Sequence, residues 1–250
     1  NRFGDICADN EKNEDAIRSW RLFLQRWPLS VDAPFVQEKI ALAYNKLRNF
    51  ESEIAERGKL ENYGPGSEWW KANSDHPLQQ NEVARMSRDA LLEAAYNRHR
   101  SAQALRQRGL ASQSGEILER AIAEYNLAAS AYRKFIEQNP ETPDAYEITF
   151  NLAETLYWSG QYAAAKTEYA RVRDSNVDSK HYADSAYMVL LCLEGLYEKQ
   201  VKEGAFASRT TAPEITGTPP AVEILTIPEI VLELMKEKDA FVKRFPNHAE

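Results

Sequence analysis

The chain has 250 residues and a formal net charge of −7. That charge argues against nucleic acid as a general partner, because phosphate binding normally needs a basic face. No apolar run approaches the roughly 20 residues that a membrane-spanning helix requires, so the sequence predicts no transmembrane segment. The 10 Gly and 11 Pro stand mostly at breaks between periodic segments, which excludes a low-complexity chain.

The first predicted helix begins at Asp9 or Asn10, either of which would serve as its N-cap, and ends at about Arg26 before Pro28. Its apolar residues recur three and four positions apart, as on one buried face. A second helix is predicted after Ser30, which would be its N-cap. Its apolar residues have the same spacing: Phe35, Val36, Ile40, Ala43, Tyr44 and Leu47.

A third helix is predicted from Phe50 to about Leu60, and an irregular stretch follows over Tyr63–Pro77. Gly64–Gly66 breaks the helix. A phosphate-binding loop is one interpretation of these glycines, but no Gly-Lys-Ser/Thr follows them and no strand precedes them. A helix-ending turn anchored by Trp69 and Trp70 is the favoured interpretation, and exposed Trp side chains at a binding hot spot are the alternative.

One long helix is predicted from about Gln79 to Arg108, with many Arg side chains and His99 on its polar faces. Phosphate or anionic lipid could bind such a helix, yet its apolar face lacks the bulky aromatic residues of a membrane-surface helix. The favoured interpretation is a solvated face paired with Asp and Glu elsewhere in the chain. Residues Gly109–Gly115 are predicted as a turn, and Glu116–Gln138 as the next helix.

The stretch Ala128–Tyr169 repeats an upstream stretch without a gap at a shift of 112 residues (128 − 16). The matched pairs include charged residues and a helix-breaking Pro as well as apolar residues. They are Ala16 and Ala128, Trp20 and Tyr132, Arg21 and Arg133, Phe23 and Phe135, Pro28 and Pro140, Asp32 and Asp144, Ala33 and Ala145, Ala41 and Ala153, and Phe50 and Tyr162. Thr142 is therefore expected to cap a helix as Ser30 does, with Pro143 at its first position. A third partial copy is Phe241–Pro246.

The later copy, with Leu152-Ala153-x2-Leu156 followed by Ala165-x3-Tyr169, resembles the tetratricopeptide repeat, a unit of about 34 residues that forms paired helices. This resemblance implies an all-α fold: a right-handed superhelical solenoid of antiparallel helix pairs, with irregular insertions. In the earlier copy Glu53 and Arg57 stand where Ala165 and Tyr169 stand later. That helix pair has either drifted from the repeat or packs differently.

Residues 179–200 form a further predicted helix that is apolar on nearly all sides, as expected for a helix between two neighbours. Residues 202–228 are rich in Thr, Pro and small residues and are predicted to loop out. Loops of this length are often functional, which makes Phe206 and Val222–Ile227 a candidate docking segment. The last predicted helix is Glu229–Phe245. The expected organisation is repeat helices with a Gly/Pro/Trp turn over 1–77, a central array over 78–201, the loop over 202–228 and the start of a further repeat over 229–250.

The sequence contains few patterns typical of metal binding, disulfide formation or catalysis. The four His, at positions 76, 99, 181 and 248, have no metal-binding spacing. Cys192 lies in an apolar helix and is expected to be a buried free thiol, and a disulfide to Cys7 is not expected. Without a nucleophile motif or a carboxylate in an apolar pocket, we predict no catalysis and no cofactor. A regulatory or targeting repeat domain of a larger enzyme or signalling protein is the alternative.

The functional prediction comes from the repeat, because stacked helix pairs curve and the first helix of each pair lines a concave face. The predicted groove consists of two matched sets: Phe35, Glu38, Leu42, Asn45 and Lys46 in the earlier copy, and Glu147, Phe150, Glu154, Tyr157 and Trp158 in the later one. Aromatic residues mixed with carboxylates suit a peptide or helix of another protein with apolar anchors and basic flanks. The aromatic members could instead be packing residues.

The segments from Trp20 to Tyr44 and from Tyr132 to Asn176 resemble tetratricopeptide proteins of the Gram-negative envelope, namely outer-membrane assembly lipoproteins and periplasmic partners of the Tol–Pal system. The stretches YGPGSEWWKAN and VRDSN are similar to large repeat proteins of myxobacteria and their relatives, some tied to gliding motility. This resemblance implies a periplasmic or outer-membrane-associated scaffold, with a cytoplasmic location as the alternative. The chain has no initiator Met, and we expect it to be a fragment of a longer repeat protein.

Overall fold

The computed structural model describes residues 2–175, 177–205 and 227–246, and this part of the chain contains 11 α-helices, one 3₁₀ helix and no strand. The all-α prediction is confirmed. The chain divides into two compact units between Arg98 and His99, inside the long helix α6 (Pro77–Ser112). Of the candidate docking segment, Phe206 and residues 222–226 lie outside the described residues.

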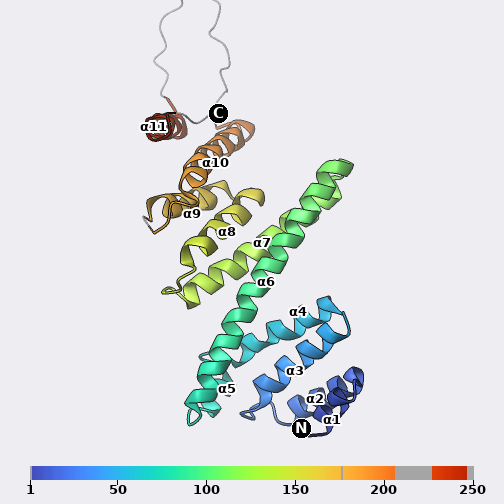
Figure 1. Ribbon diagram of the computed structural model, residues 1–250. Helices are drawn as coiled ribbons and strands as arrows, with labels where there is room; N and C mark the ends of the chain where they lie inside the picture. The colour runs from blue at the N-terminus through green and yellow to red at the C-terminus, as the bar shows by residue number, and fades with distance from the viewer. Residues whose placement is uncertain (1, 176, 206–226, 247–250) are drawn as a thin grey trace, which may run out of the picture. The chain divides into compact units, whose positions relative to one another are not determined.

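Unit 1 is built from short helices that pack in chain order, α1 on α2, α2 on α3 and α3 on α4 (Figure 1). Before the first half of α6 it contains α1 (Arg2–Asp9), α2 (Asn13–Arg26), α3 (Ala33–Lys46), α4 (Phe50–Gly58), the 3₁₀ helix η1 (Lys59–Tyr63) and α5 (Glu68–Ala72).

The main core of unit 1 joins α1, α2 and α3 around the buried side chains of Trp20 and Ile40. Helix α1 approaches closely because it carries Gly4, where a Cβ would lie 2.5 Å from Nε1 of Trp20. A second cluster forms around Trp69, which is 1% exposed and donates a hydrogen bond to the carbonyl of Ser30 at 2.7 Å. The predicted anchoring role is confirmed for Trp69.

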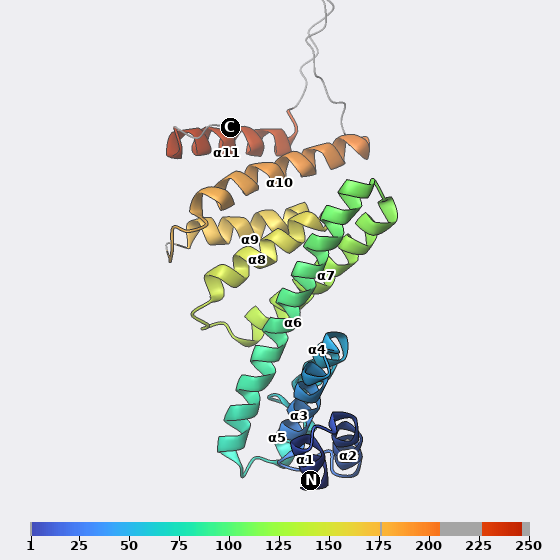
Figure 2. The same ribbon diagram turned by 45° about the vertical axis from the view of Figure 1, so that its right-hand side comes forward.

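Unit 2 continues the same ordered packing, with α7 on α8, α8 on α9, α9 on α10 and α10 on α11 (Figure 2). After the second half of α6 it contains α7 (Gly115–Gln138), α8 (Ala145–Trp158), α9 (Tyr162–Asp174), α10 (Tyr182–Lys202) and α11 (Glu229–Arg244). Large aromatic side chains fill its core, and Tyr132 and Tyr169 are completely buried. Cys192 is buried and free, as predicted, and Cys7 is also free.

The internal repeat is visible in the helix boundaries. Helices α3 and α8 have the same length and begin 112 residues apart (145 − 33), and α4 and α9 also begin 112 residues apart (162 − 50). The turn after each first helix carries the same backbone bond, from Asn49 N–H to the Tyr44 carbonyl and from Gln161 N–H to the Leu156 carbonyl, both at 2.9 Å. The repeated sequence therefore forms a repeated backbone.

The junction before Pro recurs three times. Helices α2, α7 and α11 end with a residue in nearly the same conformation, with φ of −134°, −134° and −128° and ψ near 60°. In each, that residue donates its N–H to the carbonyl of the Phe four positions earlier, at 2.8 to 2.9 Å. These Phe residues are Phe23, Phe135 and Phe241. The third partial copy, Phe241–Pro246, thus has the same backbone conformation at its helix end as the other two copies.

Several predicted helix starts are wrong. Asp9 and Asn10 do not cap α2, because Asp9 is the last residue of a separate helix, α1, and Asn10 follows it; we did not predict this helix. Ser30 and Thr142 are not N-caps either. They stand two residues before the cap positions of α3 and α8, and their carbonyls accept the first backbone N–H of each helix. Pro143 consequently precedes α8.

Other boundaries differ by a few residues. The predicted irregular stretch contains the short helix α5, which Ser67 caps by accepting a hydrogen bond from Trp70 N–H. The predicted turn at Gly109–Gly115 is shorter, because α6 continues to Ser112. In the part of the chain that the structure describes, no helix combines the length and the apolar character needed to cross a membrane.

Candidate protein-binding site

The predicted groove residues of unit 1 fall into two groups. Leu42, Asn45 and Lys46 line an open cavity of about 420 Å³ between α1, α2 and α3. Phe35 and Glu38 lie elsewhere, in packed surroundings. The cavity is the site on which a function can be built, and its lining is Asp5, Ala8, Asp9, Asn13, Trp20, Lys39, Leu42, Ala43, Asn45 and Lys46.

One wall of the cavity is held in place by Asp5. Its carboxylate accepts a hydrogen bond from Lys39 Nζ at 2.8 Å and one from Trp20 Nε1 at 3.2 Å. The hydrogen bond from Lys39 lowers the pKa of Asp5, so the carboxylate is charged at neutral pH. The ammonium also lies 6.0 Å from the centre of the Trp20 ring. This wall is therefore pre-organised by three helices.

The lining of the cavity combines an exposed apolar side chain with two charged side chains that have no ion-pair partner among the described residues. Leu42 is 46% exposed, although it belongs to a helix whose other large aliphatic residues are mostly buried. Asp9 and Lys46 are exposed and form no ion pair with any residue that the structure describes. A cavity lined by an exposed Leu, an unpaired carboxylate and an unpaired ammonium can contact both the apolar and the charged parts of a peptide.

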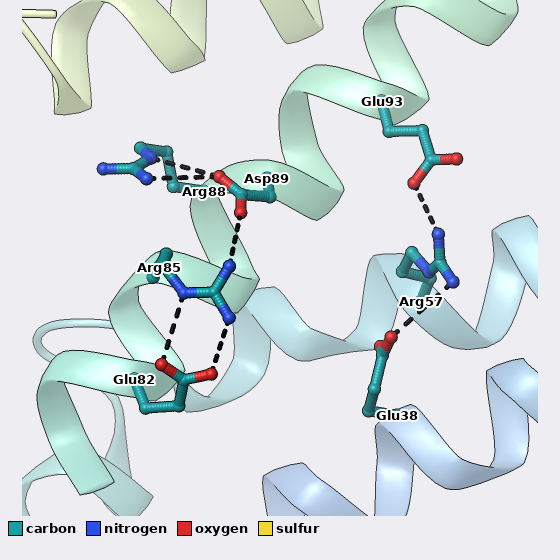
Figure 3. A network of polar contacts seen from close by, with 7 residues as sticks. All are labelled: Glu38, Arg57, Glu82, Arg85, Arg88, Asp89 and Glu93. Atoms are coloured by element: carbon teal, nitrogen blue, oxygen red, sulfur yellow. Dashed lines mark hydrogen bonds and ion pairs between the residues drawn. The ribbon is translucent and has the colours of Figure 1, made fainter. Parts of the chain in front are cut away.

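The other two predicted groove residues of unit 1 have intramolecular partners. Phe35 packs against the cluster around Trp69. Glu38 belongs to a cluster in which Arg57 lies 3.6 Å from Glu38 and 2.6 Å from Glu93 (Figure 3). Arg57 also lies 3.2 Å from Glu53. Burial raises the pKa of Glu38, and the charge of Arg57 offsets this only in part.

The charged cluster explains why Glu53 and Arg57 depart from the repeat. Arg57 joins α3, α4 and α6 by ion pairs, and Asn45 donates a hydrogen bond to Glu53 at 2.7 Å. The helix pair α3–α4 thus packs differently from α8–α9.

The described residues contain no group of His, Cys, Asp and Glu side chains that could hold a metal ion.

Part of the basic character of α6 is neutralised along the helix itself. Arg85 pairs with Glu82 and with Asp89, at 2.6 and 3.2 Å, and Arg88 pairs with Asp89 (Figure 3). These side chains are about half exposed, as expected for a solvated face. The interpretation of paired surface charges holds for these residues, with partners on the same helix.

In unit 2 the matching positions of the first turns are covered by the segment that leads into α10. Glu147 forms an ion pair with Lys180 and lies within hydrogen-bond distance of His181 Nε2, each at 2.9 Å. The ring of Phe150 stacks on that of His181, with the centroids 3.8 Å apart. Both residues already have close partners within the chain.

The remaining predicted residues of unit 2 form a contact network at the end of α8. Glu154 accepts hydrogen bonds from the Tyr169 hydroxyl and from Trp158 Nε1. The guanidinium of Arg106 lies 3.6 Å from the centre of the Trp158 ring, and Tyr157 meets Trp158 edge to face. These half-buried side chains stabilise the packing of α6, α8 and α9.

His99 is a buried side chain of unit 2 whose pKa is strongly shifted. It is 6% exposed and lies against Tyr125 and Tyr132, with its Nδ1 3.4 Å from the Tyr132 hydroxyl. Burial lowers its pKa to about 4, so the imidazole is neutral at pH 7. Burial likewise raises the pKa of the Cys192 thiol to about 12.

Sequence reasoning missed the cavity residues contributed by α1 and by the adjacent face of α3, namely Asp5, Asp9 and Lys39. The spacing of Phe3, Ile6 and Cys7 indicates a short helix, and that signal could have placed Asp5 and Asp9 on one face of it.

A scan against protein-family models matches none of them, and a search of curated proteins finds no significant relative. The fold and the site therefore define an all-α protein with an internal repeat, made of two compact units, the first of which contains an open cavity with mixed charges.

Proposed function

We propose that the chain is a non-catalytic scaffold that binds a peptide or helix of another protein in the cavity between α1, α2 and α3. The observation that carries this proposal is the place of Leu42, an exposed apolar residue on the rim of a 420 Å³ cavity whose wall is pre-organised by Asp5, Lys39 and Trp20. An apolar anchor of the ligand contacts Leu42, and an adjacent basic residue pairs with Asp9.

A tetratricopeptide-type architecture is part of this proposal. The support is the shared register of α3 with α8 and of α4 with α9, together with helices that pack in chain order. A right-handed solenoid built on this register presents the first helix of each pair on the concave face, which is where Leu42, Asn45 and Lys46 lie in the sequence.

Peptide binding is best tested with the purified chain and a displayed library of short peptides. We expect enrichment of peptides in which an apolar residue adjoins Lys or Arg. Leu42→Glu should weaken the selected peptides at least about tenfold, because a buried apolar contact and its desolvation are worth more than roughly 1.4 kcal/mol. Asp9→Lys should remove the preference for basic flanks.

The matched control is Leu47→Glu. Leu47 is 41% exposed, close to the value for Leu42, but it does not line the cavity. Peptides that bind both Leu variants equally well, or that show no dependence on Asp9, would place the binding site away from this cavity.

We also propose that the scaffold acts in a bacterial envelope complex, in the periplasm or at the outer membrane. The support is the sequence resemblance to envelope repeat proteins. Fractionation of the source cells with an antibody to this chain tests the placement, and recovery in the cytoplasmic fraction alone would contradict it.

A further inference from the structure

Arg106 of α6 lies in unit 2 among aromatic rings and a carboxylate. Its guanidinium is 3.6 Å from the centre of the Trp158 ring. Burial raises the pKa of Tyr125 and of Tyr157, and the nearby charge of Arg106 offsets part of this effect at both hydroxyls. Glu154 belongs to the same group of side chains, since its carboxylate accepts a hydrogen bond from Trp158 Nε1 at 3.2 Å.

These four neighbours of Arg106 match four residues that line the cavity of unit 1. At the shift of 112 residues the matched pairs are Tyr125 and Asn13, Glu154 and Leu42, Tyr157 and Asn45, and Trp158 and Lys46. The cavity between α1, α2 and α3 therefore lies where unit 2 has the side chain of Arg106.

The path of the chain explains why this place is open in unit 1. Helix α2 begins at Asn13, which matches Tyr125, whereas α7 begins ten residues before that position, at Gly115 (125 − 115). The additional turns of α7 pack against the last part of α6 (Figure 2). In unit 1 the chain turns between α1 and α2 at residues 10–12. No described residue of unit 1 therefore continues α1 into the place that residues 101–112 of α6 take in unit 2.

The charge that suits this place differs between the two units. In unit 2 the Trp158 ring and the Glu154 carboxylate both attract a cation. In unit 1 Lys46 and Leu42 stand at these positions, and Lys46 is exposed and forms no ion pair with the described residues. The other ammonium of the lining, that of Lys39, is already in an ion pair. The Lys46 ammonium would repel a second cation and would pair with a carboxylate.

We infer that the ligand of this cavity is a helix that takes the place of residues 101–112 of α6 and inserts a Glu or Asp side chain next to Lys46. The inference rests on the proposed function and adds the conformation of the bound segment and the charge of one of its residues. The apolar anchor and the acidic residue lie one helical turn apart on the ligand, because Leu42 and Lys46 are four residues apart on α3.

The test uses the full chain and a displayed library of short single helices that are randomised along one face. We expect selected helices to carry an apolar residue and a Glu or Asp three or four positions apart. One selected helix is then synthesised in an acidic form and in a form with Lys in place of the acidic residue. Both forms are stapled on the opposite face, so that they differ in charge and not in helicity, and their binding is measured by fluorescence polarisation.

We expect the Lys form to bind at least about tenfold more weakly than the acidic form, and Lys46→Glu to reverse this order. The matched control is Lys71→Glu, which changes the net charge equally. Lys71 is exposed on α5 and does not line the cavity, so this variant should leave the ratio unchanged. The double variant Leu42→Glu, Lys46→Trp gives the cavity the pair of residues found in unit 2, and should select Arg in place of the acidic residue.

The outcomes separate this inference from the proposed function. Helices that Leu42→Glu weakens but that bind equally well in both charge forms would overturn the inference and leave the proposed function standing. The same holds if only extended peptides bind at the cavity and lose affinity when they are stapled as helices. Binding that Leu42→Glu does not weaken, or a library without any binder, would contradict the proposed function itself.

Discussion

The hairpins α3–α4 and α8–α9 share the register of their helix starts and the same connecting turn, but they have different interiors. In α8–α9 the space between the helices is filled by Ala165 and Tyr169, both completely buried. In α3–α4 the matching positions hold Glu53 and Arg57, which form ion pairs with each other and with neighbouring helices. One register therefore accepts an aromatic core or a charged cluster, provided that each buried charge has a partner.

The comparison extends to a polar position on the first helix of each pair. Gln37 of α3 and Thr149 of α8, which match at the shift of 112 residues, are both buried. Gln37 donates hydrogen bonds to Glu56 at 2.8 and 2.9 Å, and Thr149 donates to the carbonyl of Ala145 at 2.7 Å. The first copy satisfies its polar group with a bond to the next helix, and the second does so within its own helix.

The largest expected effect comes from placing a Glu at position 165, which matches Glu53 of the first copy but lacks the ion-pair partner that Glu53 has. Ala165→Glu places a carboxylate at a completely buried position, one helical turn before the completely buried Tyr169. We expect a loss of more than about 3 kcal/mol in the free energy of unfolding. Glu53→Ala, the reverse change, removes only the bonds to Asn45 and Arg57 and should cost roughly 1–2 kcal/mol. Urea denaturation of the two variants measures both values.

A similar cost for the two variants would contradict this account, since it would mean that position 165 tolerates a charge as well as position 53 does. Ala165→Leu is the control for volume. It separates the cost of overpacking, about 1–3 kcal/mol, from that of the charge.

The second effect is a pH response that differs between the two units. His99 has a pKa of about 4 in the folded protein and an ordinary value of 6.5. Between these values the unfolded chain binds the proton and the folded chain does not, so unit 2 loses stability as the pH falls, by about 2 kcal/mol from pH 7 to pH 5. In unit 1 the raised pKa of Glu38 acts in the opposite direction, whereas the lowered pKa values of Asp5 and Glu56 mean that the stability from these two carboxylates is lost as the pH falls through the carboxyl range.

Hydrogen exchange of peptides from each unit, corrected for the intrinsic pH dependence, measures this difference. His99→Gln is the control and should remove the acid sensitivity of unit 2 without changing unit 1. An unchanged pH response in that variant would show that another group in unit 2 is titrating.

The sequence predicts the helices well where a long apolar pattern repeats. It predicts the structure less well where this depends on contacts between residues far apart in the chain. The Phe-to-Pro junction and the shift of 112 residues locate α3, α8 and the ends of α2, α7 and α11. Helix α1 was missed because it has only eight residues, of which Phe3 and Ile6 are exposed. Cap residues were misplaced because Ser30 and Thr142 contribute backbone carbonyls in place of side chains.

The candidate site shows the same limit. The register of the repeat predicts that Leu42, Asn45 and Lys46 lie on one surface, and in the structure all three line the same cavity. The wall of that cavity depends on the contact of Lys39 with Asp5, 34 residues apart, which no local pattern contains. Arg57 and Glu93 are 36 residues apart, so the anomaly at Arg57 could be noticed in the sequence but its partner could not be found there.

The smallest expected effect tests the turn that the two hairpins share. Gly160 has a φ of +78°, and the matching residue of the first copy is Arg48, with a φ of +55°. This left-handed conformation costs a non-Gly residue about 1–2 kcal/mol, and Gly adopts it without that cost. Gly160→Ala should therefore destabilise the chain by about 1 kcal/mol. Arg48→Gly relieves the left-handed strain but should stabilise the chain by only roughly 0.5 kcal/mol, because the entropy that the unfolded chain gains from the new Gly offsets part of this relief. Gly58→Ala is the matched control: Gly58 has an ordinary helical φ of −58° and open space around its Cβ position, so Ala there should stabilise the helix end. Thermal unfolding of the three variants gives the signs directly, and a stabilised Gly160→Ala would mean that the shared turn does not need its left-handed residue.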